Sequence, residues 1–192
     1  MEPEQLSAVI ASAQAGEARG FEALLDAYGP RLFGYFLRAT GHHHDAEDLL
    51  SEMSLRLVRQ LKRYDDRGRF EPWLFRIAAN MVRDRIRRRK VRPPGLSLSL
   101  DSDGQGSSIA DRLPAAAQAV DAKLLAAEAS AGIRAALENL DFTTREMILL
   151  RYFGQMSFKE LADTFECPLG TALARVHRGL AALREAMETE ES

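Results

Sequence analysis

Acidic side chains recur on one face of a predicted helix and could bind a basic partner. Asp45, Asp48 and Glu52 fall within DAEDLLSEMSLRLVRQL, which runs from Asp45 to Leu61. Their spacing places three carboxylates on one exposed side, whereas the apolar side includes Leu50, Met53, Leu57 and Leu61. Acid near a helix N-terminus is stabilising in itself, but that effect does not explain Glu52. A compact acidic stripe beside apolar residues favours docking on a basic protein surface.

Positive charge is densest in RDRIRRRKVR, from Arg83 to Arg92, where seven basic residues accompany Asp84 as the one acid. Capping of a helix C-terminus needs fewer cations, so nucleic-acid phosphate contact is favoured over a solvated helix end or a nuclear-import tag. Polar groups near aromatic residues also suit unpaired bases, which can be stacked or flipped. The candidate strand-contacting residues are Tyr64, Arg69, Arg76, Asn80, Arg83, Arg87 and Arg88.

The stretch from Thr143 to Met187 predicts three consecutive helices. Thr143 with Glu146, and Ser157 with Glu160, have the spacing of capping boxes that start two of them. The last helix follows Pro168 and has one apolar side, made of Ala172, Val176, Leu180, Leu183 and Met187. Its other side carries the residues that could read duplex DNA, which are Thr171, Arg175, His177 and Arg178. This pattern favours a helix-turn-helix, whose second helix enters the major groove, over a hairpin with solvated arginines.

Composition excludes several other classes of protein. The net charge of the chain is −2, but its two halves differ in sign. Residues 1–90 hold 16 basic and 13 acidic residues, whereas residues 91–192 hold 10 basic and 15 acidic residues. Cys167 is the single cysteine, which rules out an intrachain disulfide and a multi-cysteine zinc site. Three adjacent histidines, His42 to His44, cannot share one metal site on a helix, so no metal or cofactor is expected. No membrane span or signal peptide is evident, and a cytoplasmic location is expected.

The elements that must position these residues are all helical. The spacing of apolar residues predicts helices over residues 6–13 and 17–38, with Gly29 and Pro30 expected to bend or break the second. Another helix begins at Pro72. Proline, glycine and serine then dominate, which predicts a linker. The expected fold is all-α, with two small helical domains at residues 1–92 and 121–192 joined by a flexible linker at 93–120.

Three motifs in this order and spacing resemble the bacterial RNA polymerase sigma factors of the extracytoplasmic-function type, within the sigma-70 family. DAEDLLSEM at 45–53 looks like region 2.2, with Ser51 where glutamine is usual. WLFRIAANMVRDRIRRRK at 73–90 is similar to the helix of regions 2.3 and 2.4. LRYFGQMSFKELADTFECPLGTALARVHRGL at 150–180 looks like region 4.2.

The resemblance implies a role for each of these segments. Asp45, Asp48 and Glu52 would dock on the clamp helices of the polymerase beta-prime subunit. The loop from Tyr64 to Phe70 and the helix from Trp73 to Arg89 would melt the minus-10 element and capture one strand. Thr171, Arg175 and Arg178 would read the minus-35 element. The polymerase beta flap and an inhibitory anti-sigma factor are further expected partners, and neither catalysis nor membrane binding is expected.

One departure from the family pattern lies in the last helix. Family members often read GTVKSR at 170–175, whereas this chain has Leu173 in place of the lysine and Ala174 in place of the serine. The loss of these polar groups predicts weak or unusual minus-35 reading.

Two other classes of function explain the sequence less completely. A free-standing helix-turn-helix regulator of duplex operator DNA would explain the last helix but neither the acidic stripe nor the arginine-rich helix. An enzyme is disfavoured, because no paired carboxylates, activated nucleophile or phosphate-binding glycine loop occurs at usable spacing.

Overall fold

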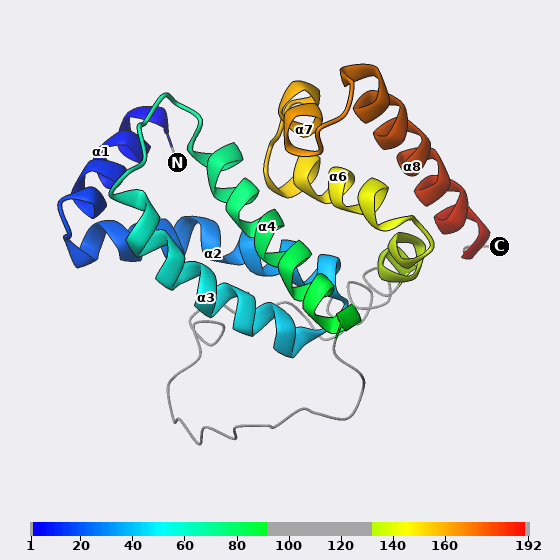
Figure 1. Ribbon diagram of the computed structural model, residues 1–192, viewed down its shortest axis with the longest axis horizontal. Coiled ribbons are helices and arrows are strands. Elements are labelled where there is room, and N and C mark those ends of the chain that lie inside the picture. Colours follow the sequence, from blue (N-terminus) through cyan, green and yellow to red (C-terminus); the bar gives the residue numbers. More distant parts are fainter. Residues whose placement is uncertain (1, 92–131, 191–192) are drawn as a thin grey trace, which may run out of the picture. The chain divides into compact units, whose positions relative to one another are not determined.

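The computed structural model describes residues 2–91 and 132–190 and divides the chain into two compact units. Within these ranges the regular elements are helices, with no strand, as the all-α expectation required (Figure 1). Among the described residues, one unit contains residues 2–68 and 77–91, and the other contains residues 69–76 and 132–190. The predicted linker at 93–120 lies outside the described residues, and the domain limits at 92 and 121 stay predictions.

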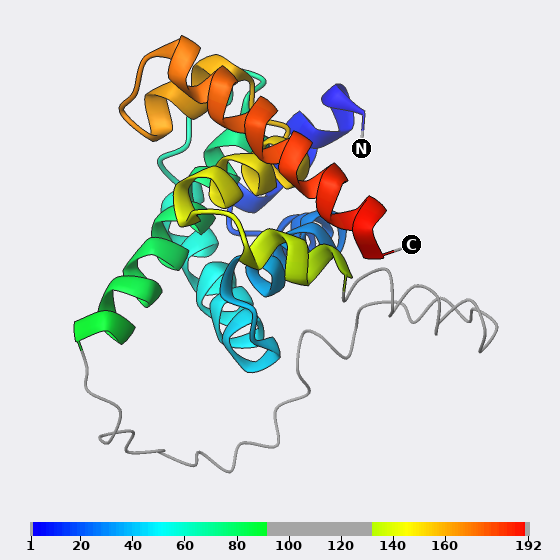
Figure 2. The ribbon, with the colours of Figure 1, turned by 90° about the vertical axis from the view of Figure 1, so that its right-hand side faces the viewer.

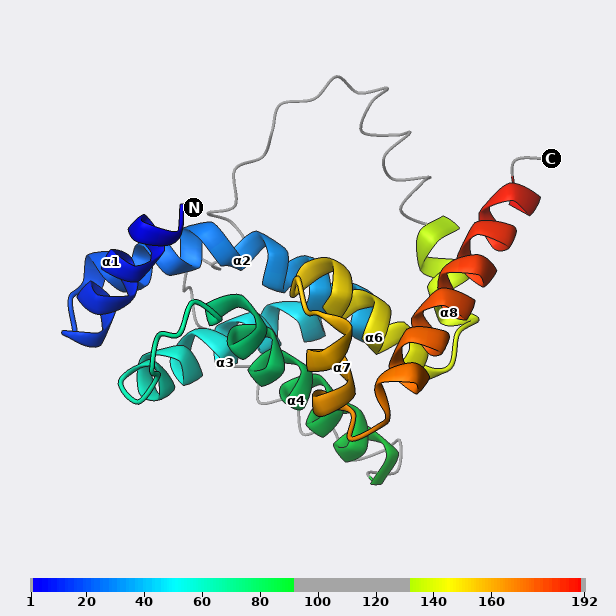
Figure 3. The same ribbon diagram turned by 90° about the horizontal axis from the view of Figure 1, so that it is seen from above.

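The first unit is built on three helices, α1 (Pro3–Gln14), α2 (Ala18–Thr40) and α3 (His43–Leu61). Helix α1 folds back along α2 and also touches α3, and α2 packs against α3 (Figure 3). Helix α4 (Phe70–Val91) contributes Ala78, Met81 and Val82 to the buried residues. The largest fully buried side chains of this unit are Tyr35, Phe36, Ile10, Leu24, Leu32, Leu49, Leu50, Met53 and Leu61. Burial of this apolar surface is the main force that holds the unit together.

Helix α2 runs without interruption through Pro30, so of the bend or break expected at Gly29 and Pro30 the break is wrong, and the bend stays a prediction. Proline inside a helix removes a hydrogen bond and costs about 3 kcal/mol. Buried side chains on both sides of the proline, including Leu24, Tyr28 and Leu32, offset that cost by anchoring both halves of the helix. The helix ends at Gly41, whose φ of 75° reverses the chain into α3.

The second unit contains a helical segment at 132–138 followed by α6 (Phe142–Phe153), α7 (Phe158–Thr164) and α8 (Leu169–Glu190). The three labelled helices contact one another in every pairing, and Figure 2 shows α8 running beside α6. The capping box at Ser157 and Glu160 is confirmed. The one expected at Thr143 is wrong, because Asp141 caps α6 by accepting a hydrogen bond from the backbone N–H of Thr144.

The turn between α7 and α8 and the contact of α8 with α6 both depend on single residues. Glu166 takes a left-handed conformation with φ of 50°, which lets the chain turn sharply before Pro168. At Gly179, an added Cβ would lie 2.5 Å from Cγ2 of Thr144 and 2.7 Å from Cδ1 of Ile148. Gly179 therefore allows α8 to approach α6 more closely than any other residue would.

The apolar side expected for the last helix is only partly correct. Ala172 and Val176 are buried, whereas Leu180 and Met187 are exposed. Both exposed residues lie beside the buried line of the helix, by about 60° to 100° of rotation.

Replacing Gly179 by alanine should destabilise the protein by about 1–3 kcal/mol, because the methyl group would overpack the contact between α6 and α8. Urea unfolding followed by circular dichroism measures the loss. Gly170→Ala is the matched control, since nothing lies within 4 Å of its added Cβ. This control should be neutral or more stable by about 0.4–1 kcal/mol. Equal effects of the two changes would contradict the close approach at Gly179.

Candidate functional site

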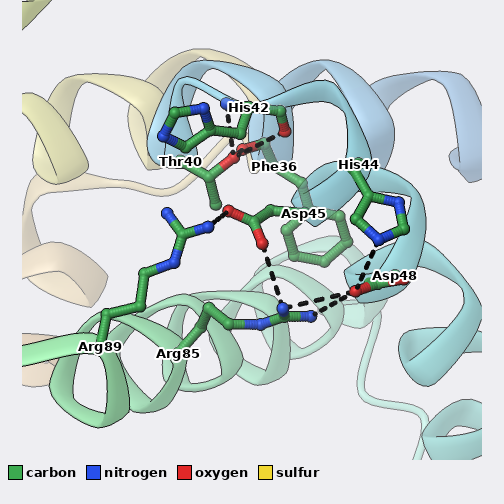
Figure 4. A network of polar contacts seen from close by, with 8 residues as sticks. All are labelled: Phe36, Thr40, His42, His44, Asp45, Asp48, Arg85 and Arg89. Carbon is green, nitrogen blue, oxygen red and sulfur yellow. Dashed lines mark hydrogen bonds and ion pairs between the residues drawn. The ribbon is translucent and has the colours of Figure 1, made fainter. Parts of the chain in front are cut away.

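A shared arginine links the acidic end of α3 to the basic half of α4 (Figure 4). Nη1 of Arg85 donates to Oδ1 of Asp45 at 3.1 Å, and Nη2 donates to Oδ2 of Asp48 at 3.2 Å. Nη2 of Arg89 lies 2.5 Å from Oδ2 of Asp45 and forms a second ion pair with this carboxylate. These pairs join helices about 40 residues apart in the chain and fix how α4 is rotated against α3.

The prediction that Asp45 meets a partner directly needs correction, because this residue is only 4% exposed. A buried carboxylate needs compensating charge, and Arg85 and Arg89 provide it within the chain. Asp48 and Glu52 are better placed, since both side chains are partly exposed, although Glu52 also pairs with Arg56 one turn later. Asp45 thus positions α3, and the two later acids remain candidates for docking.

The outer side of α3 also carries large apolar residues that sequence reasoning missed. Leu55 is 63% exposed, and Val58 is exposed one turn further along. Leu55 follows Asp48 by seven residues and Glu52 by three, so all three lie on one side of the helix. That spacing could have revealed Leu55, but a leucine in an amphipathic helix is ordinarily assigned to the core. We call the surface formed by Asp48, Glu52, Leu55 and Val58 the α3 outer face.

A polar line runs along α4 on Arg76, Asn80, Arg83 and Arg87, at spacings of four, three and four residues. Arg76 and Asn80 are exposed, and Oδ1 of Asn80 accepts a hydrogen bond of 3.4 Å from Nη1 of Arg83. Arg87 is exposed and donates to Asp84 at 2.9 Å. The helix thus brings together four of the seven residues predicted to contact a DNA strand. We call these four residues the α4 polar line.

The other three predicted strand-contacting residues lie elsewhere. The hydroxyl of Tyr64 donates to Asp66 at 3.3 Å within the loop before α4, and Arg69 is largely exposed at the end of that loop. Arg88 turns toward α3, where it lines a shallow pocket together with residues of both helices. The other lining residues are Leu49, Glu52, Arg56, Met81, Asp84 and Arg85. The arginines of α4 are therefore divided between two sides of the helix.

The residues predicted to read duplex DNA lie along the first half of α8. Thr171, His177 and Arg178 are exposed, and the ring of His177 stacks on Phe158 of α7 with centroids 6.1 Å apart. Arg175 is half-buried, with its Nη1 atom 3.3 Å from Oδ1 of Asp141 and 3.5 Å from Oγ1 of Thr144. Arg175 is thus engaged by the start of α6, unlike the other three.

The cap of α6 is tied to this contact. The hydroxyl of Thr144 donates to Asp141 at 2.6 Å and is the main cause that lowers the pKa of that carboxyl, with a smaller contribution from Arg175. Asp141 therefore stays ionised well into acid, and the charge that holds Arg175 is present throughout the neutral range.

The described residues contain neither a metal-binding cluster nor a membrane-spanning helix. No group of three or more histidine, cysteine, aspartate or glutamate side chains there is arranged to hold a metal ion. Nor does any described helix combine the length and apolar character of a membrane span.

Two family models match the chain, and together they cover most of it. The model for sigma-70 region 2 matches residues 24–92, and the model for sigma-70 region 4 matches residues 130–183. The first range includes the α3 outer face and the α4 polar line, and the second includes all of the candidate residues on α8.

Curated relatives match over nearly the full chain. The chain is 29% identical to the ECF RNA polymerase sigma factor SigW of Bacillus subtilis, over 92% of this chain and 93% of that protein. It is 32% identical to the ECF RNA polymerase sigma factor SigL of Mycobacterium tuberculosis, over 91% and 93%. It is 31% identical to the RNA polymerase sigma factor CarQ of Myxococcus xanthus, over 88% and 90%.

Solved structures share the fold. CnrH, in complex with the cytosolic domain of CnrY, aligns with a TM-score of 0.62 at 24% identity, over 94% of this chain and 96% of that one. The sigma factor RpoE of Bartonella quintana, in complex with the anti-sigma factor NepR, also gives 0.62 at 24% identity, over 89% and 98%.

Arg85→Ala should destabilise the protein by about 1–3 kcal/mol, because the buried Asp45 carboxylate would lose a charged donor. Urea unfolding measures this loss. Glu52→Ala, which breaks the exposed pair with Arg56, should cost no more than about 1 kcal/mol. The double change Asp45→Ala with Arg85→Ala should cost less than the sum of its parts. Strict additivity would mean that the two side chains are not coupled.

Proposed function

The chain belongs to the extracytoplasmic-function group of the sigma-70 family, and we propose that α3 docks on core RNA polymerase while α4 and α8 contact separate promoter elements. As a sigma factor, the protein directs promoter-specific transcription by RNA polymerase. The roles of individual residues follow from where their side chains lie.

The α3 outer face is the observation that carries the docking proposal. It combines two carboxylates with two exposed apolar side chains, and large exposed apolar residues close together mark protein interaction sites. Leu55 supplies the apolar centre of the contact, and Asp48 and Glu52 attract a basic surface at its edge. We assign the beta-prime subunit of polymerase as the surface that α3 meets.

The α4 polar line is suited to a separated DNA strand. Arg76 and Asn80 are exposed, so a cation can approach phosphate while an amide offers both a donor and an acceptor to a base edge. Arg85 and Arg89 are committed to Asp45, which leaves fewer cations for DNA than the arginine count of this segment suggests. We therefore assign minus-10 strand contact to the α4 polar line, together with Tyr64 and Arg69 of the loop before it.

Helices α7 and α8 form the helix-turn-helix that would read the minus-35 element. Thr171, His177 and Arg178 are exposed on the first half of α8, which is the part of a recognition helix that approaches base edges. Arg175 is held by Asp141 and Thr144, and we give it a positioning role, in which it fixes the start of α8 against α6.

The same assignment extends to location and partners. Transcription initiation takes place where polymerase and the chromosome are, so a cytoplasmic location is proposed. We also propose that the protein has no catalytic activity of its own. Because RpoE of Bartonella quintana was solved with an anti-sigma factor, a protein inhibitor that covers the DNA-binding or docking surfaces is proposed for this chain as well.

Leu55→Lys should weaken binding to core polymerase by about tenfold or more, since burial of a leucine side chain contributes about 1.5–3 kcal/mol. Fluorescence anisotropy of the labelled protein, titrated with core enzyme, measures the affinity. Gln60→Lys is the control, because Gln60 is exposed on the same helix but points away from the α3 outer face. Equal affinities of the Leu55 variant and the wild type would contradict the docking assignment.

Arg76→Ala should reduce the salt dependence of strand capture by the polymerase complex. Each lost phosphate contact to a single strand lowers the slope of log affinity against log salt by about 0.7. Binding of the complex to a single-stranded oligonucleotide with the non-template sequence, across a range of salt concentrations, gives the slope. Arg19→Ala removes one exposed cation from α2 instead and should leave the slope unchanged. An unchanged slope for Arg76→Ala would remove this residue from the strand contact.

A further inference from the structure

Four large apolar residues of α8 are exposed without an assigned role. Leu169, Leu173, Leu180 and Met187 are 53%, 41%, 46% and 43% exposed. At about 100° per residue they fall on one line along the helix, next to the buried line through Ala172 and Val176. The first two of these residues lie in the opening turns of α8.

The side of α8 that faces away from the unit can be located from its buried residues. Ala172, Val176 and Gly179 are buried, and a step of two residues crosses to the opposite side of a helix. Ala174 lies two residues from Ala172 and Val176, and Arg178 lies two residues from Val176. Leu173 is beside Ala174 at the edge of this outward side, where it keeps 41% of its surface exposed.

Hydrogen-bonding groups are scarce on this surface. From Leu169 to Val176 the polar side chains are Thr171 and Arg175, and the guanidinium of Arg175 lies at Asp141 and Thr144. The first two turns of α8 therefore offer the hydroxyl of Thr171 and the apolar surfaces of Leu173 and Ala174. These two turns, with so few donors and acceptors, must read bases largely by apolar contact, whereas His177 and Arg178 offer polar groups in the next turn.

One base offers an apolar group in the major groove. The C5-methyl group of thymine lies on the groove edge, where apolar side chains can contact it, whereas the other three bases present donors and acceptors there. We infer that Leu173 and Ala174 recognise thymine in the upstream promoter element through its C5-methyl group. This inference rests on the proposed contact of α8 with that element. By this inference, Leu173 and Ala174, which replace a lysine and a serine of the family pattern, give α8 a different base preference.

Leu180 and Met187 lie further along the same side of α8. They follow Leu173 by seven and fourteen residues, or about 10 Å and about 21 Å along the helix axis. Both residues follow Arg178, the last residue assigned to the reading of base edges. They therefore provide a control for the role of Leu173, since all three are exposed apolar residues on the same line.

Deoxyuridine tests the inference, because it pairs like thymidine but lacks the methyl group. The promoter is first located by mapping transcripts made after overexpression. Initiation by the complete polymerase complex is then measured on duplex templates that carry thymidine or deoxyuridine in the upstream element. The wild-type protein should lose about three- to fivefold in initiation for each contacted methyl group, the value of one buried methyl.

The variants show which residue makes the contact. With Leu173→Ala, the ratio between thymidine and deoxyuridine templates should fall toward one. With Leu180→Ala, it should stay at the wild-type value. Both side chains are exposed and alanine favours helix, so neither change should unfold the protein. An equal response of the wild type to both templates, or a wild-type ratio in Leu173→Ala, overturns the inference.

A scrambled upstream element separates this inference from the proposed function. If scrambling abolishes initiation but deoxyuridine has no effect, α8 reads the element without the thymine contact, and only the inference fails. If scrambling has no effect, the proposed reading of the upstream element by α8 fails, and the inference fails with it.

Discussion

The ion pairs between Arg85 and the two aspartates at the start of α3 constrain the rest of the first unit. A carboxylate as buried as Asp45 is unfavourable unless a cation stays close to it, so Arg85 and Arg89 must keep facing α3. This requirement fixes the rotation of α4 about its own axis. The polar line through Arg76 and Asn80 is thereby held on another side of the helix, and α3 is left with Asp48 and Leu55 facing outward.

Features that depend on neighbouring residues were predictable from the sequence. The amphipathic helices, the capping box at Ser157 and Glu160, and the helix-turn-helix follow from spacings of three and four residues. Where two local signals competed, the sequence alone could not decide. Asp141, and not Thr143, caps α6. Helix α2 continues through Pro30, a residue that ordinarily ends a helix, because side chains on both sides of it are buried.

The functional surfaces were only partly predictable, because exposure depends on contacts between distant residues. Asp45 and Asp48 have the same chemistry and lie one turn apart, yet Arg85 and Arg89 enclose the first and leave the second accessible. Leu55 was not singled out from the sequence, and its exposure became evident only from the packing of α3. Likewise, Arg175 and Arg178 are both predicted from the sequence to face DNA. Arg175 instead donates a hydrogen bond to Asp141, which lies 34 residues earlier in the chain.

Thr144 stabilises the position of α8 through two different contacts. Its methyl group lies against Gly179, and its hydroxyl donates to the carboxylate that holds Arg175. The packing of α8 on α6 thus depends on residues of its inner side, whereas Leu173 and Ala174 are exposed. Under the inferred thymine contact, substitutions at Leu173 and Ala174 change which promoters the protein recognises during evolution. The packing of α8 on α6 is retained, because other residues provide it.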